Sequence, residues 1–258
     1  MAIGVTVLAS GSNGNCIAVH ADGNTVLIDC GVSLRMLRAR MAETGIPEAS
    51  VRAILVTHRH DDHIKGVDKA AARFGVPVFT HYEAARKMEE VFKKPVTTTI
   101  LDVGAEFPLS GFMVTSFPVE HDAETVGFVL TKESSKVGIA TDMGRATQAV
   151  EFNLRDSSTL VLESNYDMDM LAMSNRTWML KQRICNGKGH LSNIQNSALL
   201  PRLLTVNTKN LILAHISHDC NQYKIAMDTA KKTLTDMRRQ DVFLDCGRRE
   251  GSIPTVWC

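Results

Sequence analysis

Five short apolar runs in this sequence each lead into a histidine or an acidic residue. The runs are rich in valine, isoleucine and leucine, and continuous runs of this kind suit strands that are covered on both faces. They are residues 26–28, 53–56, 137–140, 160–162 and 211–213, and they lead to Asp29, His58, Asp142, Glu163 and His215. Sites are commonly built on loops beyond strand ends, so we expect these side chains to gather along one edge of a sheet.

Helical stretches lie between these runs. Ser33 can cap a helix that ends near Gly45, and Asn221 can cap another. Ser192 and Gln195 form the Ser-x-x-Gln pattern of a capping box and predict a further helix start. The chain has 258 residues, of which 44% are hydrophobic, so it is long enough to bury a large core. We therefore predict an α/β fold in one domain, residues 1–258.

Charge and cysteine content limit the partners and the compartment. The 29 lysine and arginine residues nearly balance the 28 aspartate and glutamate residues, so nucleic-acid binding must rest on a local patch. No segment approaches the apolar length of a membrane span, and the first residues lack the basic flank of a secretory signal. We expect the six cysteines to be reduced thiols and the protein to be cytoplasmic, without membrane binding.

Three imidazoles and two carboxylates lie within seven residues, in the segment THRHDDH at positions 57–63. The alternative is a solvated turn in which the histidines cap backbone groups, but each histidine would then need its own partner. Imidazole nitrogen and carboxylate oxygen together suit zinc, manganese or iron, whereas oxygen alone would indicate calcium or magnesium. In an extended turn, His58 and His60 can point to one metal while Asp62 and His63 face a second.

This segment resembles the Thr-His-x-His-x-Asp-His signature of the metallo-β-lactamase superfamily, whose fold is a four-layer αββα sandwich. The resemblance extends along nearly the whole chain. In that family a later histidine completes the first metal site, an aspartate bridges both metals, and a final histidine completes the second. The positions that match are His121, Asp142 and His215. The resemblance implies two divalent metal ions, zinc or manganese with iron as a further option, held by His58, His60 and His121, by Asp62, His63 and His215, and by Asp142 between them.

The residue at the bridging position indicates the substrate class. Hydrolytic lactamases of the superfamily commonly present a cysteine there, whereas Asp142 resembles the aspartate of the phosphodiesterase and nuclease branches. Two metals roughly 3.5 to 4 Å apart can hold an attacking hydroxide and a phosphoryl oxygen at once, as in-line displacement at phosphorus requires. We therefore predict a dinuclear metal-dependent hydrolase, a phosphodiesterase or nuclease that acts on DNA or RNA ends.

A second segment, GKGHLSN around His190, resembles the Gly-His-Ser-Thr stretch of ribonuclease Z, whose histidine is thought to help protonate the leaving oxygen. Glu163 falls where that family has the glutamate that orients this histidine. By analogy, the predicted catalytic residues are Asp62, Glu163 and His190, with His190 as general acid. Ser192, at a helix N-terminus that can also bind phosphate, and Asn193 are the predicted substrate contacts. The alternative is that His190 only packs beside the turn.

Within the superfamily, the chain resembles the WalJ (YycJ)-like group of small cytosolic proteins, which are suspected exonucleases. The resemblance lies in LASGSNGNC at positions 8–16, DCG at 29–31, ESNYD at 163–167 and HLSN at 190–193. Tyr166 departs from the group because a histidine is expected there, so a contact in the substrate groove can differ. No metal ligand is lost by this change.

The remaining acidic residues and histidines are assigned no metal. We expect Asp29 to brace the loop of His58 rather than bind a cation, and Asp61 to be solvated or to support a metal-binding side chain. His20, His81 and His218 lie outside the motif positions and are expected to be surface or supporting groups.

Basic residues are frequent in the segment 174–189, which we expect to be a mobile insertion. Lys181, Arg183 and Lys188 could meet a nucleic-acid backbone there. The lysines at 231 and 232 lie on a predicted helix face that is expected to be merely solvated.

Two other functions stay open at the level of sequence. The enzyme could instead hydrolyse a lactone, thioester or β-lactam through attack on a carbonyl carbon. The chain could also be a regulatory or scaffold protein that keeps the fold and the metals without nuclease activity, although its complete ligand set argues against this.

Overall fold

The computed structural model describes residues 2–258 and contains two seven-stranded sheets that face each other. The first sheet consists, in order across it, of β14 (Val256–Trp257), β1 (Gly4–Ala9), β2 (Cys16–Ala21), β3 (Asn24–Ile28), β4 (Val51–Leu55), β5 (Val78–Thr80) and β6 (Thr98–Ile100). The second consists of β13 (Phe243–Cys246), β12 (Asn210–Ala214), β11 (Thr159–Glu163), β10 (Ser135–Ala140), β9 (Thr125–Lys132), β8 (Phe112–Val119) and β7 (Glu106–Leu109).

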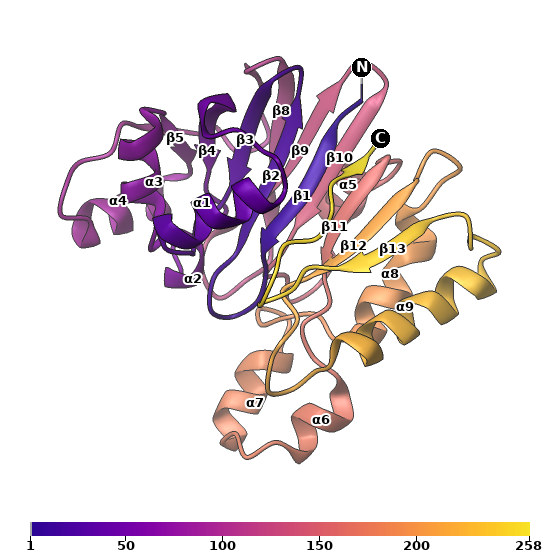
Figure 1. Cartoon of the computed structure of the whole chain (residues 1–258). Helices are drawn as coiled ribbons and strands as arrows, with labels where there is room; N and C mark the ends of the chain where they lie inside the picture. The colour runs from indigo at the N-terminus through magenta and orange to yellow at the C-terminus, as the bar shows by residue number, and fades with distance from the viewer. Residues whose placement is uncertain (1) are drawn as a thin grey trace.

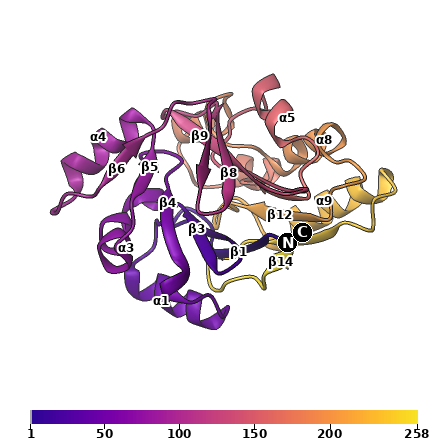
Figure 2. The same cartoon turned by 90° about the horizontal axis from the view of Figure 1, so that it is seen from above.

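Helices cover the outer face of each sheet (Figures 1 and 2). The first sheet is covered by α1 (Leu34–Glu43), α3 (Val67–Phe74) and α4 (Tyr82–Val91), and the second by α5 (Gln148–Leu154), α8 (Asn193–Leu203) and α9 (Tyr223–Asp236). A short 3-10 helix, η1 (Glu48–Ser50), precedes β4. The predicted α/β class and its four-layer αββα arrangement are confirmed. The assignment of residues 1–258 to one domain stays a prediction.

Three groups of buried apolar side chains fill the spaces between the four layers. Val26 and Ile28 belong to the group between the two sheets, whereas Leu27, between them in β3, packs in the group under α1 and α3. Leu200 of α8 lies in the third group, between the second sheet and its helices. Successive side chains of a strand point to opposite faces, so a strand buried on both faces needs an unbroken apolar run. This explains the runs in the sequence.

The parallel strands bring the ends of those runs together. β3 pairs in parallel with β4, and β10, β11 and β12 pair in parallel with one another. All five predicted runs fall in these strands, with only Val56 beyond the end of β4. The residues that follow the strands therefore gather at one end of the sandwich. The predicted convergence is present, but the strands belong to two sheets rather than one.

Two of the three predicted helix caps are confirmed. The Ser33 side chain accepts a hydrogen bond from Met36 N at the start of α1, and Ser192 forms the predicted capping box with Gln195 at the start of α8. The prediction for Asn221 is wrong, because α9 has Gln222 at its N-cap, with no side-chain cap. Asn221 is buried, and its Oδ1 accepts hydrogen bonds from Asn193 Nδ2 and from the backbone N of Gln222, the next residue, rather than from an N–H group within α9.

Three short helices lie at the end of the sandwich where these strands finish. α2 (Asp61–Ile64) follows β4, and α6 (Met168–Met173) and α7 (Trp178–Cys185) protrude between β11 and α8 (Figure 1). α7 forms half of the segment 174–189, so this insertion is partly helical, and its mobility stays a prediction. Among residues 2–258, no helix has both the length and the apolar character needed to span a membrane.

Candidate metal centre

Each predicted metal-binding side chain comes from a loop or helix at this end of the sandwich. His58 follows β4, His60 is the N-cap of α2, and the next two predicted donors, Asp62 and His63, lie within that helix. The other three, His121, Asp142 and His215, follow β8, β10 and β12. Both sheets therefore contribute to one cluster, although its members are up to 157 positions apart (58 to 215) in the chain.

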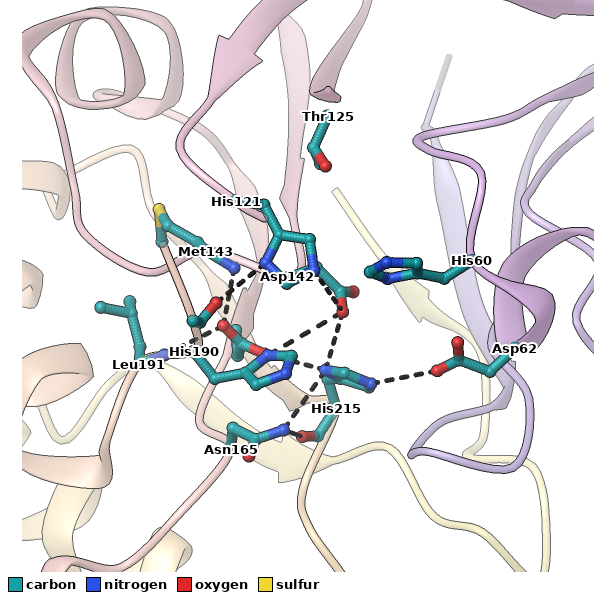
Figure 3. Close-up of polar contacts among 12 residues, drawn as sticks. His60, Asp62, His121, Thr125, Asp142, Met143, Asn165, His190, Leu191 and His215 are labelled. Atoms are coloured by element: carbon teal, nitrogen blue, oxygen red, sulfur yellow. Dashed lines mark hydrogen bonds and ion pairs between the residues drawn. The ribbon is translucent and has the colours of Figure 1, made fainter. Parts of the chain in front are cut away.

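Among the described residues, the cluster contains four overlapping sets of possible metal donors, and two of these sets are the predicted groups of three. The donor atoms of His58, His60 and His121 lie within 4.8 Å of one another, and so do those of Asp62, His63 and His215. Asp142 lies between the groups, with Oδ2 3.1 Å from Nε2 of His63 and Oδ1 3.9 Å from Nε2 of His121. Figure 3 shows the side chains of His60, Asp62, His121, Asp142 and His215 directed toward one another. The sequence predicted these two groups, and their binding of metal ions stays a prediction.

Three histidines present the same face to the centre. The Nδ1 atom of His63 lies 2.7 Å from Oδ2 of Asp29, and that of His121 donates to the Gly189 carbonyl at 2.9 Å. In His215, Nδ1 lies 2.8 Å from a carboxylate oxygen of Glu163. Metal-binding histidines usually donate their second nitrogen in this way, which fixes the ring and leaves Nε2 for the cation.

Polar atoms in the middle of the cluster lack partners. Nε2 of His121, Nε2 of His215 and Oδ2 of Asp142 are buried and make no hydrogen bond of good geometry with any described residue. Buried polar groups are nearly always hydrogen-bonded, so such atoms need an explanation. Imidazole nitrogens and a carboxylate oxygen are ligands that suit divalent cations such as zinc and manganese, and the donor set therefore fits divalent metal binding.

The charges of the cluster reinforce this arrangement. Burial lowers the pKa of His58 well below its ordinary value, which keeps that imidazole neutral. Burial alone would also lower the pKa of His63, but the carboxylates of Asp142 and Asp29 outweigh it and raise this pKa. Burial would raise the pKa of Asp142, but His215 and the other imidazoles hold it well below its usual range. Asp142 is therefore an anion in the middle of the centre.

Three residues that follow strands at the centre have a left-handed backbone. Asp29, Asp142 and His215 have φ angles of 60°, 55° and 55°. Residues other than glycine rarely adopt this conformation, which costs about 1–2 kcal/mol per residue. The sharp turn directs each side chain away from the strand axis and into the end of the sandwich.

Asp29 supports the loop of His58, as predicted. Its two carboxylate oxygens accept hydrogen bonds from the backbone N and the hydroxyl of Thr57, at 2.8 and 2.9 Å, besides contacting His63. Nearby, a Cβ atom at Gly31 would lie 1.6 Å from the carbonyl oxygen of Asp62. Glycine thus allows the loop after β3 to pack directly against α2, which accounts for the DCG segment.

His190 lies beside the same cluster, where the sequence placed it. Its Nδ1 is 2.7 Å from Oε1 of Glu163, and its side chain is 22% exposed. The other carboxylate oxygen of Glu163 accepts hydrogen bonds from the backbone N atoms of Met143 and Leu191, at 2.7 and 3.1 Å. Burial would raise the pKa of Glu163, but His190 above all, together with His215, lowers it to about 2. Glu163 is therefore a fixed anion that orients the imidazole of His190.

A cavity of about 230 Å³ opens onto the centre. Its lining includes predicted metal donors, among them Asp62 and Asp142, together with His190. Further lining residues, Arg176 and Arg183, come from the segment that contains α7. The cavity thus joins the metal-binding cluster to the insertion.

The predicted substrate contacts lie outside this cavity. Ser192 is buried and caps α8, and Asn193 is buried with its side chain hydrogen-bonded to Ser164 and Asn221. Tyr166 is also buried, in a small apolar cluster, and burial raises its pKa to about 12. In this structure these three side chains hold the loops behind His190 together, and the role of Ser192 and Asn193 in substrate binding stays a prediction.

Two residues at the centre were missed by the sequence analysis. Oδ1 of Asp122 lies 3.3 Å from Nε2 of His60 and 3.2 Å from Nε2 of His121. Nδ2 of Asn15 lies 3.0 Å from Nε2 of His63. The only available signals were that Asp122 is adjacent to His121 in the chain and that Asn15 lies in the glycine-rich opening turn.

The amino-acid sequence of this chain is similar to a known protein family and to named nucleases. A family model described as the Beta-lactamase superfamily domain matches residues 24–216. Exodeoxyribonuclease YycJ of Bacillus anthracis is 31% identical over 239 residues, which are 92% of this chain and 90% of that protein. Ribonuclease Z of Mycobacterium sp. (strain KMS) is 27% identical over 177 residues, 54% of this chain and 61% of that protein.

Solved structures agree with these similarities. The crystal structure of the metallo-beta-lactamase fold protein YhfI from Bacillus subtilis superposes with a TM-score of 0.73 at 14% identity, covering 97% of this chain and 99% of YhfI. The predicted resemblance to the YycJ-like group, and the weaker one to ribonuclease Z, are therefore confirmed.

Proposed function

The chain belongs to the beta-lactamase superfamily, and from that premise we propose that it is a metal-dependent phosphodiesterase that acts on the ends of DNA or RNA. One observation carries the proposal. A buried aspartate, Asp142, lies between two groups of three donors, so the position shared by both groups holds a carboxylate. A shared carboxylate suits the pair of cations that catalyses displacement at phosphorus.

The donor groups would hold the two cations as follows. His58, His60 and His121 would bind one, Asp62, His63 and His215 would bind the other, and Asp142 would contact both. The mixed nitrogen and oxygen donors suit zinc or manganese, and also iron. When bound, such a pair lowers the pKa of water and stabilises negative charge on the phosphoryl oxygens.

His190 would then act as the general acid. Its Nδ1 is held by Glu163, while no hydrogen bond to Nε2 from any residue in 2–258 is found, and His190 lines the cavity. With Nδ1 held by Glu163, Nε2 is the ring nitrogen left to donate a proton to the leaving oxygen. Asp62 also lines the cavity, and its carboxylate is placed to accept a proton from the attacking water.

The relatives support nucleic acid as the substrate. YycJ, which is similar over most of this chain, is named an exodeoxyribonuclease, and ribonuclease Z is also a nuclease by name. We further propose that the protein acts in the cytoplasm, where the reducing conditions suit its six cysteines, all of which are free thiols in the structure.

An end-labelled nuclease assay tests the proposal. The purified protein, loaded with manganese or zinc, should shorten single-stranded or double-stranded oligonucleotides from an end, and EDTA should stop the reaction. A variant with Asp142→Asn is the matched control for a contaminating nuclease, because it should be inactive in the same preparation.

Two model substrates separate the rival functions. The protein should hydrolyse bis-p-nitrophenyl phosphate and leave a chromogenic β-lactam intact. Hydrolysis of the lactam alone would assign the protein to carbonyl chemistry instead. Absence of hydrolysis with every metal, in a protein that has bound the metal, would favour a scaffold role.

A further inference from the structure

The segment 174–189, which contains α7, differs in charge from the rest of the chain. It holds four basic residues, Arg176, Lys181, Arg183 and Lys188, and no aspartate or glutamate, whereas the whole chain has a net charge of +1. A local patch of this kind is what a chain of balanced charge needs in order to bind a polyanion.

The helix of this segment contributes little to the core, with a partly buried Ile184 that packs against the small apolar cluster of Tyr166. α7 has no buried residue, and its Trp178 and Met179 side chains are 72% and 80% exposed. Large apolar side chains are normally buried because contact between apolar surface and water is unfavourable. An exposed indole beside basic residues therefore suggests a surface that binds a ligand. Aromatic rings interspersed with cations are typical of surfaces that bind single-stranded nucleic acid.

One face of this helix opens onto the metal centre. Leu180, Arg183 and Ile184 are spaced i, i+3 and i+4, so they share one side of α7, and all three line the cavity. The guanidinium of Arg183 binds the carboxylate of Asp122 at 2.5 Å, and Asp122 in turn contacts His60 and His121. The carboxylate of Asp122 therefore links Arg183 to two predicted metal donors.

Arg176, at the start of the segment, also lines the cavity and has an unused donor. One terminal nitrogen binds Asp219 at 3.0 Å, but its Nε is buried and has no hydrogen-bond partner within residues 2–258. A buried donor without a partner is costly, and a phosphate oxygen would satisfy it. Guanidinium groups bind phosphates through paired N–H donors, which neither a lysine nor an amide reproduces.

We propose that the segment 174–189 is the strand-binding surface of the enzyme, on which a single strand of nucleic acid lies as its end enters the metal centre. Arg176 and Arg183 bind the phosphates next to the scissile one, Lys188 adds a further phosphate contact, and the Trp178 indole stacks on a base. Trp178 and Arg183 are five residues apart, which is roughly 7.5 Å along a helix, so the two contacts fall on different parts of the strand. This inference rests on the proposed function.

Substrates of different length test the surface. A small diester such as bis-p-nitrophenyl phosphate can occupy the metal centre without reaching Trp178 or Lys188, whereas a single-stranded oligonucleotide reaches both. Trp178→Ala should raise KM for the oligonucleotide roughly tenfold. Lys188→Gln should raise the same KM and make its dependence on salt shallower by about 0.7 in the log–log slope, as expected when one phosphate contact of a single strand is lost. In both variants the ratio of kcat/KM for oligonucleotide over small diester should fall.

Arg183→Lys is a further variant, because it keeps the charge and removes the paired donors. We expect a rise in KM for the oligonucleotide, with metal content as in the wild type. Lys231→Gln is the matched control, since it removes the same unit charge from an exposed position on α9 and should leave both activities unchanged. Equal responses of the two substrates, or an equal effect of Lys231→Gln and Lys188→Gln, would overturn the inference.

A binding measurement distinguishes failure of the proposed function from failure of the proposed strand-binding surface. If the wild type hydrolyses neither substrate, fluorescence anisotropy of a labelled oligonucleotide with the metal-loaded protein still measures strand binding. Weaker binding in Trp178→Ala and Lys188→Gln then supports the surface, and undiminished binding refutes it. A change in molecular mass on Trp178→Ala in analytical ultracentrifugation would also refute it, because the exposed ring would then join two copies of the chain.

Discussion

Glu163 binds His190 through a hydrogen bond of 2.7 Å between Oε1 and Nδ1. The same oxygen lies 2.8 Å from Nδ1 of His215, a predicted metal donor. A single buried carboxylate therefore orients both the proposed general acid and a ligand of the proposed metal centre. Because a change at Glu163 would disturb both, the acid role must be tested at His190 itself.

Replacing His190 by alanine should lower turnover and leave the metals in place. A general acid contributes typically 10²- to 10⁴-fold, so we expect a loss of that order in kcat on an oligonucleotide. The loss should be smaller on bis-p-nitrophenyl phosphate, because p-nitrophenolate leaves without a proton. Steady-state kinetics and metal analysis measure the two effects, with His20→Ala as a control far from the centre. Parallel loss of metal and turnover would count against the acid role.

Replacing Asp142 by asparagine should reduce cation occupancy. The aspartate is buried and contacts donors of both groups, so the amide removes a charge that the two sites share. Elemental analysis of protein purified without added metal should give two cations per chain for the wild type and fewer for the variant. Asp61→Asn, which changes an acidic residue of the same turn outside the predicted donor set, should bind as many as the wild type. Full occupancy in Asp142→Asn would exclude the bridging assignment.

Asp29 should tune the centre without binding a cation. Its carboxylate holds Thr57 and the Nδ1 atom of His63, and loss of such a supporting contact typically weakens metal affinity 10- to 100-fold. We expect Asp29→Asn to weaken binding within this range, as measured by competition with a chelator. Binding as tight as in the wild type would show that the Asp29–His63 contact is dispensable.

Cation affinity should increase with pH. Burial opposes protonation of His63 and His215, but Asp142 and neighbouring carboxylates raise the pKa of each well above its ordinary value. Without metal these rings therefore keep protons that a cation must displace, and affinity falls as the pH drops below the raised pKa values. Calorimetric titrations in buffers of different ionisation enthalpy should show proton release on binding. Binding without proton release would contradict the charge state assigned to these histidines.

The same protons affect the stability of the metal-free protein in the opposite sense. A histidine whose pKa is raised by folding stabilises the folded state below its unfolded pKa of about 6.5. This contribution is lost as the pH rises through the raised value. Thermal unfolding without metal should therefore show the effect of His63 disappearing toward alkaline pH, whereas added cations should stabilise the protein most in that range.

Much of the fold and the centre could be predicted because the relevant signals are local. A strand buried on both faces must be an apolar run, and the residue after such a strand in a parallel sheet must lie at the shared edge. Asp142 and His215 satisfy both conditions within the second sheet, so their convergence followed from the strands. His58 follows a strand of the first sheet, and the packing of the two sheets brings it to the same end. The compact motif at 57–63 then supplied several donors from a single turn.

The remaining features depend on contacts between distant parts of the chain. Asn221 is a residue type that often caps helices, but its side-chain oxygen accepts a hydrogen bond from Asn193, which lies 28 positions earlier in the chain. Asp122 gains its place from His60 and Arg183, which lie 62 and 61 positions away in the chain. Local patterns could not show that these side chains meet, nor that Ser192 and Asn193 turn inward.

The left-handed turns after the strands imply that an isolated peptide with the same residues would not form this centre. Asp29, Asp142 and His215 adopt a backbone shape that a short fragment would abandon, since nothing outside the two packed sheets imposes it. A metal-binding segment cut from the chain would keep the donor residues, but their side chains would no longer point toward a common centre. Cation capture by this molecule is thus a property of its tertiary structure, and should vanish on unfolding well before any covalent damage.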